Sequence, residues 1–217
     1  MKKVLSFVLG LGLLVSCGRG ERVSKDVFEE VNKNMEVKRL TEVEILEEAM
    51  IWGDSITQEA QQNLITKLQN AIAEKGIPGA VEYCKVNALP ILEEVGKKHG
   101  VTVKRVSNRF RNPADQPDSD EAPILEAYEY NAENGLSIDP NLQKLENGEV
   151  LLYTKAIIIP GGLCLNCHGD PGKDISAETL QTLESLYPQD QAKGHKVGDL
   201  RGMWAVRFPK REVVKRL

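Results

Sequence analysis

The spacing of apolar residues predicts two consecutive helices at the start of the folded part of the chain. From 41 to 74, apolar residues recur every three or four positions, which is the period of an amphipathic helix. Thr41 and Glu44 have the spacing of a capping box, which indicates where this helix begins. The segment Gly76-Ile77-Pro78-Gly79 is expected to end it and to begin a second helix.

The second helix is expected from about 78 to 99, with Cys84 on its apolar face. The helical period places this cysteine with Val81 and Ala88, so its thiol is expected to point inward. Pro90 lies inside the pattern, and a proline there predicts a kink or a restart of the helix.

Farther along, shorter apolar runs predict a few strands between helices. No βαβ repetition is present, which favours an α+β fold with an antiparallel sheet. The proline- and aspartate-rich stretch from 107 to 120 is expected to be a loop, and loops of this length in compact domains are commonly functional. The expected strands are 101–106, 148–160 and 202–209, and the expected helices are 122–131 and 176–186.

The first residues have the pattern of a bacterial export signal. Lys2 and Lys3 precede an apolar run over 4–15, which ends in Leu14-Val15-Ser16-Cys17. The run is shorter than the roughly 20 residues that span a bilayer, which favours a cleaved signal over a permanent anchor. Its last four residues resemble a lipobox, so Cys17 is expected to be the lipidated first residue of the mature chain. Ordinary secretion with a chance cysteine is the alternative.

This interpretation divides the chain into a lipoprotein signal peptide (1–17), a tether (18–39) and a folded domain (40–217). Lipid on Cys17 would anchor the domain to a bacterial membrane facing the periplasm. Gly18, in place of an aspartate after the cysteine, resembles the signal that sorts lipoproteins to the outer membrane.

Charge and composition narrow the range of partners. The chain has 28 basic and 32 acidic residues, and loss of Lys2 and Lys3 with the signal would leave a net charge of −6. Nucleic-acid binding is therefore not expected. Aromatic residues make up only 5% of the chain, so a large apolar cofactor could supply core volume that side chains do not.

The segment Cys164-Leu165-Asn166-Cys167-His168 has the spacing that attaches c-type haem. In such a site Cys164 and Cys167 form thioethers with the haem vinyl groups, and His168 is an axial ligand of the iron. A redox-active thiol pair and half of a zinc site use the same residue types. The redox pair is expected in a βαβ context and the zinc site needs a second close pair of ligands. The sequence predicts neither, which favours one covalent haem.

One cysteine remains after these assignments, because Cys17 is assigned to lipid and Cys164 and Cys167 to haem. Cys84 is then an inert buried thiol, half of an intermolecular disulfide or a metal ligand. Its expected inward position makes the disulfide the least favoured of the three. Burial statistics alone favour the inert thiol over the ligand.

A series of short motifs accompanies the haem segment. In chain order they are Ala80-Val81-Glu82-Tyr83-Cys84, Arg105-Val106-Ser107, Arg111-Asn112-Pro113 with Pro117-Asp118, Cys164-Leu165-Asn166-Cys167-His168-Gly169 and Trp204-Ala205-Val206. This order, from Leu40 to Pro209, resembles the Tll-type c-haem domain family, a PAS-like haem-binding domain of bacteria and cyanobacteria. The resemblance implies that His168 and Cys84 are the two axial ligands. Asp115 stands where the resemblance predicts asparagine.

Other residues are candidates for secondary roles around a haem. Arg109 and Arg111, in the long loop, are expected to bind the anionic propionates, with ordinary surface salt bridges as the alternative. Three residues compete with Cys84 as the second axial ligand, and an open or water-bound position is a further alternative. They are Met203, expected in the core, His195, expected in a solvated loop, and His99, expected at a helix end.

The expected function is a redox or small-ligand sensor, in which reduction of the iron weakens the bond to Cys84 and frees a position for a diatomic gas. A membrane-tethered electron carrier with a periplasmic redox partner is the alternative. The sequence has no kinase or receiver segment, and this slightly favours the electron carrier over the sensor. An enzyme such as a peroxidase is not expected, because a second C-x-x-C-H motif is absent.

Overall fold

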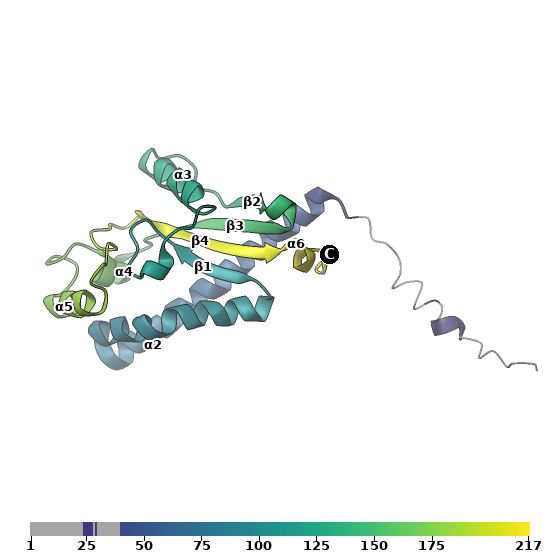
Figure 1. Cartoon of the computed structure of the whole chain (residues 1–217). Coiled ribbons are helices and arrows are strands. Elements are labelled where there is room, and N and C mark those ends of the chain that lie inside the picture. The colour runs from purple at the N-terminus through teal and green to yellow at the C-terminus, as the bar shows by residue number, and fades with distance from the viewer. Residues whose placement is uncertain (1–23, 28, 30–39) are drawn as a thin grey trace, which may run out of the picture. The chain divides into compact units, whose positions relative to one another are not determined.

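A computed structural model describes residues 24–27, 29 and 40–217 (Figure 1). The chain divides into two units, Met1–Arg39 and Leu40–Leu217. The predicted signal peptide, Cys17 and most of the predicted tether lie outside the described residues. Among the residues that are described, no helix is both long enough and apolar enough to cross a membrane.

From Leu40 onward, helices surround one four-stranded sheet. In chain order the elements are α2 (Glu42–His99), β1 (Thr102–Val106), the 3-10 helix η1 (Pro113–Asp115), α3 (Ala122–Glu133), β2 (Asn141–Leu145), the 3-10 helix η2 (Glu146–Gly148), β3 (Val150–Ile158), α4 (Gly162–His168), α5 (Ala177–Leu186), β4 (Leu200–Pro209) and α6 (Lys210–Val214).

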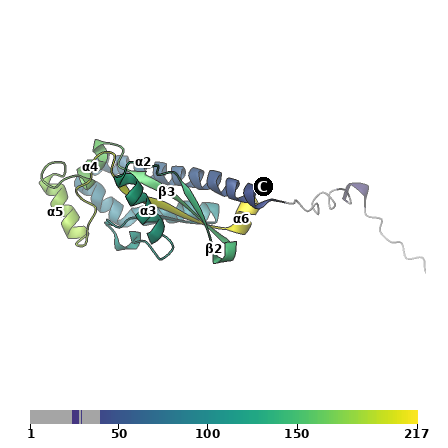
Figure 2. The same ribbon diagram turned by 90° about the horizontal axis from the view of Figure 1, so that it is seen from above.

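The sheet is antiparallel throughout, with the strand order β1-β4-β3-β2. Its side chains alternate between two faces. On β4, Trp204 and Val206 pack with residues of α2, whereas Met203 and Ala205 pack with residues of α3. Figures 1 and 2 show α2 on one face of the sheet and α3 on the other. This arrangement confirms the predicted α+β, PAS-like class with an antiparallel sheet and flanking helices.

Helix α2 consists of two arms that meet at Gly76. This residue has φ 68° and ψ −178°, a conformation that glycine adopts without steric cost. The arms lie side by side, since the Lys98 Nζ of the second arm is 2.8 Å from the Glu59 Oε1 of the first. The predicted break between the two helices is therefore confirmed. The capping box of Thr41 and Glu44 is also present.

The restart of the helix, one of the two outcomes predicted at Pro90, does not occur, because the helical dihedrals of α2 are interrupted only at Gly76. Pro90 lacks the N–H that would bond to the carbonyl of Val86. The side chain of Val86 is 69% exposed, so this carbonyl lies on the outer side of the helix, where solvent can satisfy it. The helix therefore continues through the proline.

One end of the sheet gathers the segments that build the site. β1 ends and β4 begins there, since Val106 pairs with Met203. β3 ends there too, since Ile158 pairs with Leu200. α4 follows β3 after three residues, and Figure 2 shows α4 and α5 together at this end, away from α6.

Candidate functional site

A cavity of about 280 Å³ lies between the arms of α2, this end of the sheet and α4. The volume is close to the lower end of the roughly 300–1,000 Å³ found for small-molecule sites. Most of the wall is apolar, with both arms of α2 and the end of β3 contributing. Its apolar side chains include Leu64, Leu68, Ile72, Val81, Ile157 and Trp204.

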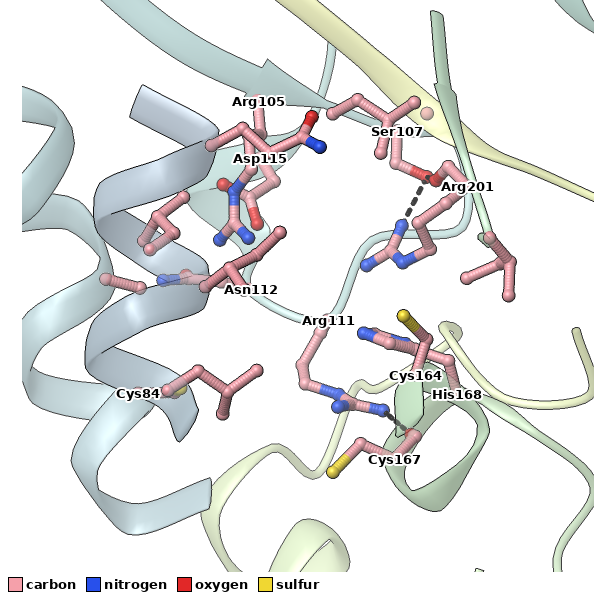
Figure 3. Close-up of a pocket in the computed structure, with 18 of the residues that line it drawn as sticks. Cys84, Arg105, Ser107, Arg111, Asn112, Asp115, Cys164, Cys167, His168 and Arg201 are labelled. Carbon is pink, nitrogen blue, oxygen red and sulfur yellow. Dashed lines mark hydrogen bonds between the residues drawn. The ribbon is translucent and has the colours of Figure 1, made fainter. Parts of the chain in front are cut away.

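The three residues of the predicted haem motif lie on α4 and line this cavity (Figure 3). Cys164 and Cys167 are three positions apart, so a helix presents them on one side. Both are free and half-buried. Burial raises the pKa of both thiols, so they are protonated at neutral pH. The cavity thus has two S–H groups at one edge.

His168 is held by the segment 190–195, which we call the strap. The Nδ1 atom of His168 is 2.8 Å from the carbonyl oxygen of Ala192. A carbonyl only accepts, so Nδ1 carries the proton and the lone pair is on Nε2. Burial, with the charges of Arg201 and Arg111, lowers the pKa of His168 well below its ordinary value. The imidazole is therefore neutral, as a metal ligand must be.

Backbone bonds fix the strap against the end of α4. The N–H of His195 donates to the carbonyl of His168 at 2.8 Å, and the N–H of Gly194 donates to the carbonyl of Gly169 at 2.8 Å. Asp190 sets the other end of the strap, because its Oδ1 accepts the N–H of Ala192 at 2.9 Å. The carbonyl that orients His168 is therefore fixed on both sides.

Cys84 lines the same cavity from the second arm of α2, on the side opposite α4 (Figure 3). Val81, one turn earlier on α2, packs in one cluster with Cys167. Burial raises the pKa of the Cys84 thiol, although the charges of Arg105 and Arg111 oppose this. The inward orientation predicted from the helical period is confirmed. The fold thus brings the remaining cysteine to the cavity that Cys167 and His168 line.

Arg111 lines the cavity, but its guanidinium already has partners in the fold. Nη2 donates to the carbonyl of Cys167 at 2.5 Å and lies 3.2 Å from Oδ2 of Asp190. The carboxylate of Asp190 is fully buried. Arg111 therefore ties α4 to the strap, a role that the sequence did not reveal.

Arg109 is not among the residues that line the cavity. Its guanidinium donates to the carbonyl of Lys193 and lies 3.4 Å from Nδ1 of His195. The strap thus holds this side chain on the outside of the site. The propionate contact predicted for Arg109 has no support in this placement.

Two arginines with no role predicted from the sequence also line the cavity, Arg105 in β1 and Arg201 in β4. Burial and the charges of Arg105 and Arg111 lower the pKa of Arg201 to about 9, so it is still charged at neutral pH. Beside them Asp115 is buried, which raises its pKa, and its Oδ1 has no hydrogen-bond partner. The available signal was strand alternation, which puts Arg105 on the face of the buried Val103.

The three competing ligands do not line the cavity. Met203 is buried on the α3 face of the sheet, and His99 pairs with Glu59 at 2.8 Å. His195 is only 2% exposed, so the prediction of a solvated histidine is wrong. The strap folds back on α4 and buries the ring against His168, with 6.3 Å between the ring centroids.

The zinc and redox-pair alternatives can be compared with the same geometry. Within the described residues, no three His, Cys, Asp or Glu side chains are grouped so as to hold a metal ion. α4 does follow a strand, as redox-active thiols of the thioredoxin kind do, but this strand pairs antiparallel on both sides. The zinc alternative therefore lacks its second pair of ligands in this part of the chain.

The donors around the cavity fit a haem. The apolar wall suits a porphyrin ring, the two thiols suit its vinyl groups and a neutral imidazole suits its iron. The Nε atoms of Arg105 and Arg111 are buried without a hydrogen-bond partner. Anionic groups of a ligand would satisfy such donors.

The fold and the site define a class of α+β domains in which a Cys-x-x-Cys-His helix borders an apolar cavity lined by arginines. The chain belongs to the Tll0287-like family, whose model matches residues 23–209. Among solved structures, it is similar to the cyanobacterial haem protein Tll0287, with a TM-score of 0.55 and 25% sequence identity over 71% of this chain and 91% of that chain. No curated protein matches it. The family predicted from the motifs is confirmed.

Proposed function

We propose that this chain is a c-type haem protein with one haem, held by Cys164, Cys167 and His168 on α4 and by Cys84 on α2. The observation that carries the proposal is the convergence of these residues on one apolar cavity from two sides. Similarity to a solved haem protein supports it further.

Each of these residues has a definite task in this proposal. The thiols of Cys164 and Cys167 would add across the two vinyl groups, so that each S–H becomes a thioether with no leaving group. Nε2 of His168 would hold the iron, because Nδ1 is held by the strap. Cys84 would be the second ligand of the iron and would bind as a thiolate, since a coordinated thiol loses its proton.

The ligand pair sets what the site does. A bound haem supplies a one-electron ferric/ferrous couple, and a thiolate ligand favours the ferric state. We propose a redox or small-ligand sensor, in which Cys84 would leave the iron on reduction and free a position for a diatomic gas. We propose no enzymatic turnover, and peroxidase activity well above that of free haem would contradict this.

A membrane-tethered electron carrier is the second candidate, and one observation favours it. Leu163, beside the first motif cysteine, is 44% exposed, so the thioether edge of the haem would lie near the surface, where electrons exchange fastest. Binding of carbon monoxide by the reduced protein supports the sensor. Absence of that binding, with rapid electron exchange with small redox proteins, supports the carrier.

Location is proposed from the first residues alone. The export pattern and Cys17 support a lipoprotein anchored to a bacterial membrane, facing the periplasm, with the outer membrane favoured by Gly18. Expression in a bacterium followed by membrane fractionation tests this. The wild-type chain is expected in the membrane fraction, and Cys17→Ser is expected to lose that attachment.

Covalent attachment is tested on protein matured in a bacterial periplasm that has haem-attachment enzymes. A pyridine haemochrome assay is expected to give one haem per chain, and the haem is expected to stay on the chain in a denaturing gel. The double variant Cys164→Ala, Cys167→Ala is expected to lose the haem in that gel, whereas Leu165→Ala, within the same helix, keeps it. A wild-type chain with no covalent haem would contradict the proposal.

A further inference from the structure

The three arginines that line the cavity are not equivalent. Arg111 has partners in the fold for its Nη2, the carbonyl of Cys167 and the carboxylate of Asp190, and only its Nε is buried without a hydrogen-bond partner. The side chain of Arg105 has no hydrogen bond or ion pair with any described residue, and its Nε is buried. Arg201 uses only Nη1, which donates to Oγ of Ser107 at 2.9 Å and to the carbonyl of Arg109 at 3.1 Å. Donors of Arg105 and Arg201 therefore remain available to a ligand.

The carboxylates near the cavity do not balance this charge. Asp190 is engaged by Arg111 and by Lys193, whose Nζ is 3.6 Å away. That leaves Asp115 as the acidic group beside both Arg105 and Arg201. Two guanidinium groups with one carboxyl between them leave excess positive charge in a half-buried site. Such charge is costly unless an anion meets it.

The position of these groups fits one kind of anion. In Figure 3, Arg105 and Asp115 lie on the far side of the cavity from Cys164 and Cys167, and Arg201 lies between these two sides. On a haem, the carboxylates project from the edge opposite the vinyl groups. A ring attached at the two cysteines would therefore direct its carboxylates toward the side of Arg105, and Arg201, between the two sides, could reach the nearer carboxylate (Figure 3).

We propose that Arg105 and Arg201 form a carboxylate-binding subsite for the two propionates of the porphyrin. The inference rests on the proposed haem function. It replaces the expectation that Arg109 and Arg111 of the long loop bind the propionates. Arg111 acts on the protein side, by joining α4 to the strap, and Arg109 lies outside the cavity. Asp115 competes with the propionates for the same two guanidinium groups.

The test uses the full chain with Cys164→Ala and Cys167→Ala, so that binding is reversible, and two iron-free ligands. Protoporphyrin IX has two free carboxylates, and its dimethyl ester has none. Neither needs an axial ligand, so the readout is independent of Cys84 and His168. Binding is followed by quenching of the fluorescence of Trp204, which lines the cavity.

The parent chain is expected to prefer the free acid by roughly tenfold or more, the value for hydrogen bonds to charged groups. Arg105→Gln and Arg201→Gln are each expected to lose most of that preference, and Arg105→Lys to keep part of it. Asp115→Asn is expected to increase it. The matched control is Arg109→Gln, which removes the same charge outside the cavity and should keep the full preference.

The outcomes separate the subsite from the haem function. If the parent binds both porphyrins equally well, or if Arg109→Gln loses as much preference as Arg105→Gln, the subsite is overturned and the haem function stands. If the parent binds neither porphyrin while its circular dichroism matches that of the wild-type chain, the proposed function fails as well. Should Arg105→Gln not fold, Arg105→Lys and Asp115→Asn decide the matter, since unchanged preference in both would overturn the subsite.

Discussion

The carbonyl oxygen of Ala192 lies 2.8 Å from Nδ1 of His168 and fixes which nitrogen of the ring faces the cavity. This contact depends on Asp190, which binds the N–H of Ala192 through one oxygen and pairs with Arg111 through the other. The buried carboxylate of Asp190 therefore orients the His168 ring, on α4, through the carbonyl of Ala192. Hydrogen-bond acceptors of this kind fix the direction and basicity of a metal-binding histidine.

Asp190→Asn is expected to destabilise the protein by about 3–5 kcal/mol, because it leaves the half-buried Arg111 without its carboxylate. Urea unfolding of the full chain measures the change. Asp120→Asn is the matched control, since Asp120 pairs with Arg207 at 3.3 Å but its side chain is 48% exposed. An exposed pair contributes less than about 1 kcal/mol. Equal losses in the two variants would show that burial of Asp190 has no energetic consequence.

The two arms of α2 are joined by Glu59, whose oxygens lie 2.8 Å from Lys98 Nζ and 2.8 Å from His99 Nε2. These hydrogen bonds lower the pKa of Glu59 below its ordinary value of 4.5. The stabilisation is therefore present above about pH 4.5 and is lost as the pH falls through the lower pKa of the folded state.

Glu59→Gln is accordingly expected to cost about 0.5–1 kcal/mol at pH 7, the range for partly exposed pairs. The cost should shrink toward zero in acid, where the wild-type carboxyl is also neutral. Unfolding curves at pH 7 and near pH 3 measure both values. A cost that is the same at the two pH values would mean that the charge of Glu59 contributes nothing.

Gly53 is a contact point between α2 and the sheet. A Cβ atom at this position would lie 2.3 Å from Cγ of Tyr153, a fully buried ring on β3. Gly53→Ala is therefore expected to destabilise the protein by about 1–3 kcal/mol or more, as measured by thermal unfolding. Gly162→Ala is the control, because nothing lies within 4 Å of its Cβ position. Alanine is also the better helix former by about 1 kcal/mol, so this variant should be neutral or more stable.

Much of the fold could be predicted because its signals are local. The period of α2, the capping box at Thr41 and the break at Gly76 are all set by neighbouring residues, and each is present. β2 was not predicted, because Asn141–Leu145 is a polar edge strand whose burial pattern is weak. α4 and α6 were missed because short helices depend on tertiary contacts rather than on their own periodicity.

The parts of the site that follow from residue spacing could be predicted from the sequence. The parts that depend on tertiary contacts could not. The Cys164–His168 motif and the inward face of Cys84 follow from sequence distance. The burial of His195, the engagement of Arg111 and the exposure of Arg109 follow from how the strap folds back on α4. Arg105 and Arg201 meet only because β1 and β4 pair. No local pattern contains that information.

The central claim is that Cys84 and His168 bind the same iron, and low-temperature electron paramagnetic resonance of the ferric protein tests it most directly. The wild-type chain is expected to give a low-spin signal with the g values of a thiolate ligand. Cys84→Ser is expected to lose that signal, whereas His99→Gln, which removes a histidine outside the cavity, keeps it. A low-spin spectrum that is unchanged in Cys84→Ser would contradict the account.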